Sequence, residues 1–291
     1  TGVQTCALPI SLLVLTQNEP TQITVRNRMS QMTTVHWHGI ELESYFDGVG
    51  EFGGDPKRSR APMIHTGHEF TAKFTPPRAG TFMYHTHMIE AEQGEGGLAG
   101  PIVVLKPGEK FDPNRDHVIL ATPARNFADQ GRVMLINGLP TPEAIEVVAG
   151  QKHRLRFINL HTFETGLTAE LKEGSTFGVW RALAKDGRDL PASRQTERAS
   201  RQMISIGETF DFEFVAKAGG EYKLELTNPR FNKVWTTIPI RVVAAPTRRA
   251  EMIRPAGTKP EESWWSTLAS LLPSIDRKST RLNSSHTDIS R

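Results

Sequence analysis

The sequence is short of cysteine, of long apolar runs and of clustered basic residues. Its 291 residues include one cysteine, Cys6, and so few thiols leave the redox compartment undetermined. No run of about eighteen apolar residues is present, which excludes a membrane-spanning helix. Lys and Arg do not cluster among aromatic residues, so no nucleic-acid partner is indicated. No convincing long helix can be traced either.

Both ends of the chain have the pattern of a translated sequencing adapter. Thr1–Ile10 (TGVQTCALPI) and Asp276–Ser285 (DRKSTRLNSS) can be encoded by opposite strands of one oligonucleotide, and His286–Arg291 would continue it. Such segments are set aside before fold reasoning. We therefore expect residues 1–10 and 276–291 to be non-native. The genuine protein would be about Ser11–Ile275, a piece of a longer gene, and any export signal would have been lost with the true N-terminus.

Without these ends the chain is nearly neutral. The formal net charge of the whole sequence is +3. Residues 276–291 hold four basic and two acidic residues, so about +1 remains for the rest. Cys6 also falls in the expected adapter, which leaves the genuine segment without cysteine. An apolar content of 37% and a charged content of 23% are typical of a globular protein.

The chain is organised around two histidine pairs, His36-Trp37-His38 and His85-Thr86-His87. The runs Met32–Trp37 (MTTVHW) and Gly80–Tyr84 (GTFMY) are rich in β-branched and aromatic residues, which predicts strands. Residues two apart in a strand share a face, so each pair directs two imidazoles the same way. Imidazole is a good ligand for Cu, Zn, Fe and Ni. If the two strands are neighbours, His36, His38, His85 and His87 form a metal cluster.

The rest of the chain predicts an all-β protein with a sandwich in each half, because short strand-like runs alternate with turn signals. Lys106–Asn114, with two prolines and a glycine, is the best domain boundary. We expect a ligand-bearing domain at 11–107, a second domain at 108–247 and a linker at 248–275 that includes a possible short helix, Ser263–Leu272. The predicted strands are Ser11–Leu15, Thr21–Asn27, His68–Phe74, Leu98–Leu105, His117–Thr122, Val133–Asn137, Ala144–Val148, His153–Leu160, Met203–Ile206, Phe210–Ala216, Tyr222–Thr227 and Val234–Val243. Between them, 40–61 and Glu90–Gly97 are predicted to be glycine-rich loops.

With these motifs the first half resembles the multicopper oxidases, the laccase-like group built from cupredoxin domains. The resemblance covers Thr21–Leu105 and includes both histidine pairs, Asp47-Gly48, the turn Phe74–Thr81 (FTPPRAGT) and Gly100-Pro101. The second half is similar, more loosely, to the copper-free spacer domain of that family. Its markers are Ile136–Gly138 (ING), Arg154–Asn159 (RLRFIN), Asp186–Pro191 (DGRDLP) and Ile206–Glu208 (IGE). The resemblance implies two cupredoxin-like Greek-key β-sandwich domains.

The resemblance also implies a function. Family members oxidise a small reducing substrate, such as a phenol or a metal ion, at a blue copper and reduce dioxygen to water at a trinuclear copper cluster. By resemblance His36 would bind the type 2 copper, and His38, His85 and His87 the type 3 pair. Asp47 falls where the family keeps an acidic residue that assists proton delivery, a task that suits a carboxylate. A periplasmic or secreted location is implied as well.

The sequence departs from the family pattern in its other copper motifs. His-x-x-His-x-His and His-Cys-His-x-x-x-His, which supply the remaining four cluster ligands and the blue copper site, are absent. A blue copper site needs a thiolate and two imidazoles, and the genuine segment has no cysteine. We therefore expect half of a trinuclear site, no type 1 site, and a partner cupredoxin domain, upstream or downstream, that carries the rest. Alone, the fragment is expected to be inactive.

Other candidate residues have plainer interpretations. His65 and His68 are expected to be surface or hydrogen-bonded residues rather than extra ligands. The isolated histidines His117, His153 and His161 are expected to be structural or solvated. Trp37 and Met83 are expected to fill core. The spacing of Met63 and Met88 is too irregular for a thioether copper site. Glu41 and Glu43 are expected on a solvated edge rather than as hydrogen-bond partners behind the ligand histidines.

Three alternative functions stay open from the residues. A copper-free cupredoxin-fold binding or assembly protein would have the same fold, but such relatives lose ligand histidines that this chain keeps. A copper nitrite reductase would need a cysteine-containing blue site and lacks the paired His-x-His pattern. A zinc hydrolase is disfavoured because no helix carries a glutamate between its histidines.

Overall fold

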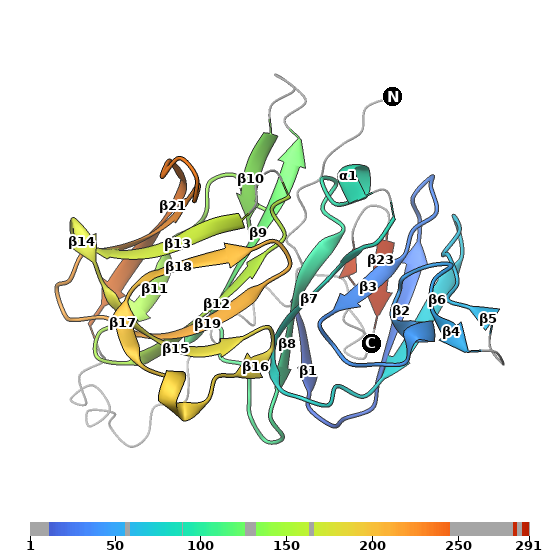
Figure 1. Ribbon diagram of the computed structural model, residues 1–291, viewed down its shortest axis with the longest axis horizontal. Coiled ribbons are helices and arrows are strands. Elements are labelled where there is room, and N and C mark those ends of the chain that lie inside the picture. Colours follow the sequence, from blue (N-terminus) through green and yellow to red (C-terminus); the bar gives the residue numbers. More distant parts are fainter. Residues whose placement is uncertain are drawn as a thin grey trace, which may run out of the picture.

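The computed structural model describes residues 12–55, 59–88, 90–125, 132–162, 166–244, 282–283 and 287–290. They form two β-sandwiches that lie side by side (Figure 1). The predicted all-β fold with two cupredoxin-like sandwiches is confirmed. Helical segments in the described residues are single turns, and none could cross a membrane. The predicted adapter at 1–10 and the linker at 248–275, with Ser263–Leu272, lie outside the described residues.

The first sandwich uses strands from residues 13–105. One sheet has the order β1 (Leu13–Thr16), β8 (Ala99–Leu105), β7 (Gly80–Thr86) and β3 (Val35–His38), and the facing sheet pairs β2 (Thr21–Asn27) with β6 (Glu69–Phe74). Strand β2, predicted from the sequence, alternates between its two faces, because Ile23 and Val25 are buried whereas Gln22 and Arg26 are exposed. Trp37 packs in the core between the sheets, as predicted.

The edge of β2 carries a further strand from the far end of the chain. β23 (Thr287–Ser290) pairs antiparallel with β2 and also with β22 (Leu282–Asn283). This pairing does not test the adapter origin of 276–291, because the free edge of a sheet can pair with any extended segment. That origin stays a prediction.

The second sandwich uses strands from residues 116–243. One sheet has the order β10 (Arg132–Ile136), β9 (Asp116–Arg125), β12 (Lys152–Asn159), β19 (Thr209–Val215), β15 (Val179–Lys185) and β16 (Arg188–Asp189), with β17 (Glu197–Ala199) beside β15. The facing sheet has the order β11 (Ile145–Val148), β21 (Val234–Val243), β20 (Tyr222–Thr227), β13 (Gly166–Glu173) and β14 (Thr176–Phe177), with β18 (Arg201–Ser205) beside β13. Trp180 stacks on Phe212 in the core, with ring centroids 4.0 Å apart.

The loops of the first sandwich differ in part from the prediction. The described residues of the predicted long loop, 40–55 and 59–61, include the 3-10 turn η1 (Ser44–Phe46) and the paired short strands β4 (Gly54–Asp55) and β5 (Ser59–Arg60). Glu90–Gly97 was expected to be loop throughout, but its first residues form the single helical turn α1 (Glu90–Gln93). A buried Gln93 at the end of this turn explains the difference, because its side chain is hydrogen-bonded on three sides.

Strand β7 is buried on both faces because it belongs to two cores. Phe82 and Tyr84 point into the first sandwich, whereas Met83 packs against Leu120 and Ile158 of the second. Residues two apart share a face, so His85 is on the same face as Met83. The histidine face of β7 is therefore the face that the second sandwich partly covers.

A buried ion network joins the two sandwiches below this histidine face. Asp211 of β19 is 1% exposed, and its Oδ2 accepts hydrogen bonds from Thr81 of β7 (2.9 Å), from Arg154 (2.6 and 3.0 Å) and from Arg156 (3.1 Å). Arg156 also donates two hydrogen bonds to Asp116 Oδ1, at 2.6 and 2.9 Å. Buried charges are stable only when paired in this way, so the network holds β7 in a fixed position against the second sandwich.

Candidate metal centre

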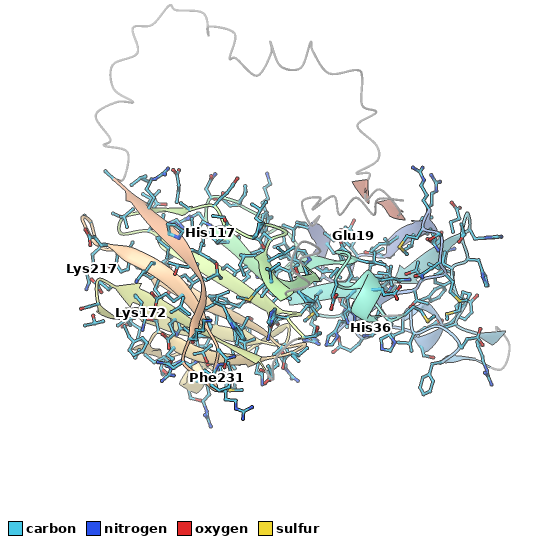
Figure 2. All side chains as sticks on the ribbon, turned by 90° about the horizontal axis from the view of Figure 1, so that it is seen from above. Glu19, His36, His117, Lys172, Lys217 and Phe231 are labelled. Atoms are coloured by element: carbon cyan, nitrogen blue, oxygen red, sulfur yellow. The ribbon has the colours of Figure 1, made fainter. Side chains whose placement is uncertain are left out.

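The two histidine pairs meet on one face of the ribbon formed by β3 and β7. The strands are antiparallel, and His36 lies directly opposite His85. The His36 ring centroid is 5.4 Å from those of both His38 and His85, and the latter two are 5.3 Å apart. The two strands thus bring the imidazoles together as their spacing predicts. Figure 2 shows His36 on the first sandwich, well away from His117 on the second.

Three of the four predicted ligands lie within coordination reach of one ion. His36, His38 and His85 each offer a ring nitrogen, and these atoms all lie within 4.8 Å of one another. His87 follows the end of β7 and is exposed. Its ring centroid is 5.6 Å from that of His36 and 6.2 Å from that of His85. The fourth histidine therefore borders the trio without joining it, and the ligand role of all four stays a prediction.

Backbone carbonyls determine which ring nitrogen carries hydrogen in two of these residues. His36 Nδ1 lies 2.9 Å from the carbonyl oxygen of Asp47, and His85 Nδ1 lies 2.7 Å from that of Thr86. A carbonyl oxygen only accepts, so each Nδ1 donates an N–H and each Nε2 keeps a lone pair. Metal-binding histidines donate their second ring N–H to such oxygens. The rings of His36 and His85 therefore fit a metal bound through Nε2.

His38 completes the trio as a neutral imidazole. Its Nδ1 lies 3.1 Å from His85 Nε2, and because that nitrogen is an acceptor, His38 Nδ1 donates and its Nε2 keeps a lone pair. A metal bound to His85 Nε2 would take the place of this hydrogen bond, because the nitrogen has one lone pair. Burial, followed by the nearby rings of His85 and His36, lowers the pKa of His38 from 6.5 to about 4. Imidazole must be deprotonated to bind a metal, so near neutral pH no proton has to leave. Imidazole nitrogens suit Cu, Zn, Fe or Ni.

Asp47 lies beside the trio, at the end of the turn η1. Its Oδ1 is 3.2 Å from His36 Nδ1. Gly48 makes the close approach possible: its φ is +79°, and a Cβ there would lie only 1.7 Å from the carbonyl oxygen of Val35. The loop therefore presses a carboxylate against the first ligand strand. The catalytic role of Asp47 stays a prediction.

Two residues that the sequence pattern did not indicate also support the site. Gln93 accepts hydrogen bonds from Thr33 and Thr86, both at 2.7 Å, and so ties the start of the β3 segment to the end of β7. Gly207, in the turn between β18 and β19, leaves room beside the His38 ring, because a Cβ there would stand 3.3 Å from His38 Cε1. Neither residue carries a local signal, because Gln93 stands in a glycine-rich run and Gly207 belongs to the other half of the chain.

The other histidines lie apart from the trio. His65 and His68 are exposed, and His68 Nδ1 lies 3.1 Å from the carbonyl oxygen of Thr66. His117 and His153 stack, with 3.0 Å between His117 Nε2 and His153 Nδ1. The last histidine among the described residues, His161, is 4% exposed and packs on Trp235. These placements agree with the surface and structural roles expected from the sequence.

The acidic and sulfur side chains agree as well. Glu41 is an exposed edge residue whose carboxylate accepts from Arg78 Nε at 2.7 and 3.0 Å, not from a ligand histidine. Glu43 is also exposed. Met83 is 1% exposed and fills the core between the sandwiches.

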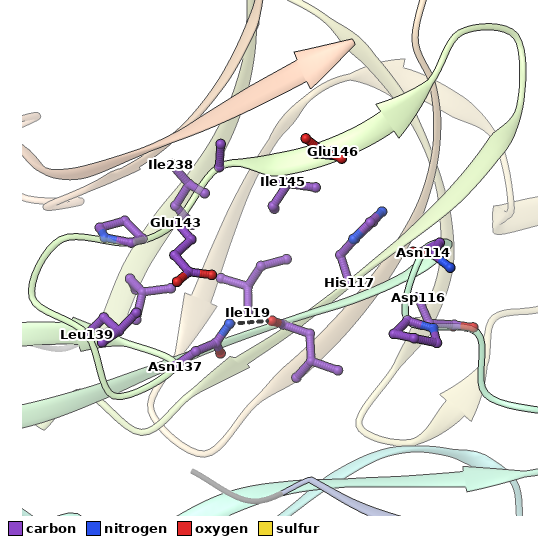
Figure 3. Close-up of a pocket in the computed structure, with 15 residues that line it drawn as sticks. Asn114, Asp116, His117, Ile119, Asn137, Leu139, Glu143, Ile145, Glu146 and Ile238 are labelled. Carbon is purple, nitrogen blue, oxygen red and sulfur yellow. Dashed lines mark hydrogen bonds between the residues drawn. The ribbon is translucent and has the colours of Figure 1, made fainter. Parts of the chain in front are cut away.

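A cavity of about 410 Å³ lies in the second sandwich, and its lining includes His117, Glu143, Asn137 and several isoleucines (Figure 3). None of the four predicted ligands lines it. Asn137 donates a hydrogen bond to the carbonyl oxygen of Val118 and accepts one from Leu120 N–H. Both its amide nitrogen and its amide oxygen therefore already bond to the backbone of β9.

Comparisons with known proteins agree with this arrangement. The sequence model of the multicopper oxidases matches residues 6–109. Copper resistance protein A of Pseudomonas syringae pv. tomato is 34% identical over 133 residues, which are 45% of this chain and 20% of that protein. Laccase-2 of Fomitopsis schrenkii is 32% identical over 157 residues, 46% of this chain and 28% of that one. The matched segments span less than a third of these relatives.

Solved structures extend the likeness to both sandwiches. The multi-copper oxidase of Pseudomonas thermotolerans is 25% identical with a TM-score of 0.61, over 86% of this chain and 58% of that one. The blue copper oxidase of Nitrosomonas europaea is 21% identical with a TM-score of 0.63, over 79% of this chain and 76% of that one, and shows the fold. Residues 6–109 are thus similar to the multicopper oxidase family, and the two sandwiches share the fold of solved multicopper oxidases.

Proposed function

We propose that this chain supplies half of the trinuclear copper centre of an oxidase that takes electrons from small substrates, phenols or metal ions, and reduces dioxygen to water. One observation carries the proposal. Three imidazoles with ligand nitrogens within 4.8 Å stand on the two strands that hold the His-x-His pairs, inside the segment that matches the family.

Each predicted ligand has a distinct role in the proposal. His36 would hold the type 2 copper, and His38, His85 and His87 the type 3 pair. When bound, copper supplies the one-electron redox chemistry. The carbonyl oxygens that accept from His36 Nδ1 and His85 Nδ1 hold both rings with Nε2 toward the site. Asp47, 3.2 Å from the His36 ring, would hold or release a proton there.

The proposal requires a second source of ligands. Outside the predicted adapter the chain has no cysteine, and a blue copper site needs a thiolate. A further cupredoxin domain would therefore supply the type 1 site and the remaining histidines, and this chain alone would not turn over substrate. A periplasmic or secreted location would suit such an oxidase.

Copper titration of the purified chain tests the ligand assignment. Wild type should bind Cu(II) without the intense blue absorption of a copper thiolate. His85→Ala should weaken binding at least about tenfold, because losing a ligand costs no less than losing its outer-shell partner. His65→Ala is the matched control, since His65 is exposed and lies apart from the trio.

The possible results of this titration distinguish the proposed copper site from the copper-free alternative. Equal copper affinity of His85→Ala and His65→Ala would refute the ligand assignment. A wild-type chain that binds no copper would favour the copper-free binding protein instead. Addition of the missing domain should restore oxygen consumption, and His85→Ala should then abolish it while the blue copper can still be reduced.

A further inference from the structure

Arg78 joins the end of the first ligand strand to the second sandwich. It lies in the turn between β6 and β7. Its Nη2 donates to the carbonyl oxygen of Gly39 and its Nη1 to that of Asp186, both at 2.7 Å. Gly39 directly follows His38, and Asp186 lies in the turn between β15 and β16. One guanidinium therefore links the residue after a predicted ligand to the other sandwich.

The remaining contacts of this guanidinium hold it in one orientation. Its Nε donates to the carboxylate oxygens of Glu41 at 2.7 and 3.0 Å. Its Cζ lies 4.9 Å from the ring centroid of Phe82 in β7. A guanidinium is planar and offers its N–H groups in fixed directions. Because each of its three nitrogens has an acceptor here, the group cannot turn without losing a hydrogen bond.

The carbonyl of Asp186 is a firm anchor for this contact. The N–H of Asp186 donates to the carbonyl oxygen of Thr209, and its Oδ1 accepts from the N–H of Thr209, both at 3.0 Å. The hydroxyl of Thr209 donates to the carbonyl oxygen of Thr81 in β7 at 3.0 Å. Figure 1 shows β16 beside β7. The hydrogen bonds thus run from Arg78 through the second sandwich back to the strand that carries His85.

The contact with Gly39 holds the chain where the sheet ladder stops. The paired register of β3 with β7 ends at His38. Gly39 has a φ of +84°, so the chain turns directly after this ligand. Beyond His38 the carbonyl of Gly39 is held by Arg78 instead of by a neighbouring strand. Arg78 therefore fixes the backbone on the side of His38 that the ladder leaves free.

We propose that Arg78 is a positioning residue of the copper centre, which holds the backbone at the end of β3 and so keeps the His38 ring beside His36 and His85. The proposal rests on the copper-binding function above. Ring nitrogens of these three histidines lie within 4.8 Å of one another, so a displaced strand end would widen the site. The second sandwich then has a part in the site through its β15–β16 turn, although it holds none of the four predicted ligands.

Replacement of arginine by lysine tests this role, because it keeps the charge but removes the fork that reaches two carbonyl oxygens at once. Arg181→Lys is the matched control for Arg78→Lys. Arg181 also donates to a backbone carbonyl, that of Gln195, and lies beside the carboxylate of Glu213, but all of these contacts are within the second sandwich. The two arginine side chains are 27% and 39% exposed.

Copper affinity of the whole chain is measured together with the imidazole ¹⁵N shifts of the metal-free chain, and His117 on the second sandwich is the reference ring. Arg78→Lys should bind Cu(II) about three- to tenfold more weakly than Arg181→Lys, less than the loss from removing a direct partner of a ligand. It should also shift the His38 resonances but not those of His117.

Equal copper affinities of the two variants would overturn the positioning role while wild type still binds copper. Weaker binding by Arg78→Lys with unshifted His38 resonances would overturn it too, because general destabilisation would then be the cause. Failure of wild type to bind copper would instead overturn the proposed function.

If Arg78→Lys does not fold, substitution of its acceptor takes its place. Glu41→Gln removes the charge that orients Arg78 Nε. Glu69→Gln is the control, because Glu69 accepts from Arg26 Nε at the same distance of 2.7 Å within the first sandwich. Glu41→Gln should weaken copper binding about two- to threefold relative to Glu69→Gln and shift the same His38 resonances. Equal effects of the two substitutions would overturn the positioning role.

Discussion

Replacement of Asp211 by Asn tests whether the buried ion network joins the two sandwiches. The substitution keeps the shape of the side chain but removes its charge, which Arg154, Arg156 and Thr81 contact through four hydrogen bonds to Oδ2. Asp211 is 1% exposed, so no water can replace the lost interaction. The substitution therefore changes the charge of the network and places an amide NH₂ where the buried Oδ1 stood.

The expected cost follows from the surroundings of each arginine. Removing one partner of a buried ion pair costs about 3–5 kcal/mol. Arg154 has a side chain 30% exposed and can regain water, and Arg156 keeps two hydrogen bonds to Asp116. Both effects reduce the penalty, and the amide oxygen still accepts. We therefore expect a loss of about 2–3 kcal/mol in the free energy of unfolding.

Urea unfolding followed by tryptophan fluorescence measures this loss, because Trp37 and Trp180 report on the first and second cores. Asp189→Asn is the control: this carboxylate is 54% exposed and pairs with Lys106 at 3.2 Å, and exposed pairs contribute about 0–1 kcal/mol. If Asp211→Asn costs no more than Asp189→Asn, the network does not stabilise the contact between the sandwiches, and that reasoning is wrong.

Three further predictions concern other parts of the chain. Gln93→Ala should lower the free energy of unfolding by about 1–2 kcal/mol in urea titrations, because the hydroxyls of Thr33 and Thr86 lose their 2.7 Å acceptor and keep only backbone carbonyls at 3.3 and 2.9 Å; a loss below about 0.5 kcal/mol would contradict this. Burial lowers the pKa of His161 to about 4 from 6.5, so its contribution is complete above pH 6.5 and is lost as the pH falls toward 4. That loss is up to about 3 kcal/mol, and His161→Phe should flatten the dependence in unfolding measurements from pH 7 to 4. An unchanged slope would show that another group controls it. Trp180→Ala should cost about 3–5 kcal/mol, since this buried ring stacks on a phenylalanine 4.0 Å away, and a smaller loss would mean that the second core relaxes into the space.

The histidine ribbon could be predicted because its determinants are local. β-branched neighbours predict strands, and a period of two places His36 with His38 and His85 with His87 on shared faces. Pairing of the two histidine strands is not determined locally, but it was inferred because two His-x-His motifs can share a metal only if their strands are neighbours. The structure added the register, in which His36 and His85 are direct partners.

Strands β13 and β15 were not predicted, because local propensity opposes them. Gly166–Glu173 (GLTAELKE) and Val179–Lys185 (VWRALAK) contain several helix formers such as Ala, Leu, Glu and Lys. Their strand state comes from pairing with β20 and β19. The proximity of Gly207 to His38 could not be predicted either, because packing of the two sandwiches brings together residues far apart in the chain.

Because β7 is buried in both cores, the stability of one sandwich depends on that of the other. A strand with one face in each hydrophobic interior cannot keep its shape when either interior melts. If the proposed function holds, destabilising changes deep in the second sandwich, remote from the four predicted ligands, should thus reduce occupancy of the first by copper. A screen for variants that lose copper would then find substitutions in both sandwiches. Their positions would depend on whether they destabilise a core that contains β7, and not on their distance from the predicted ligands.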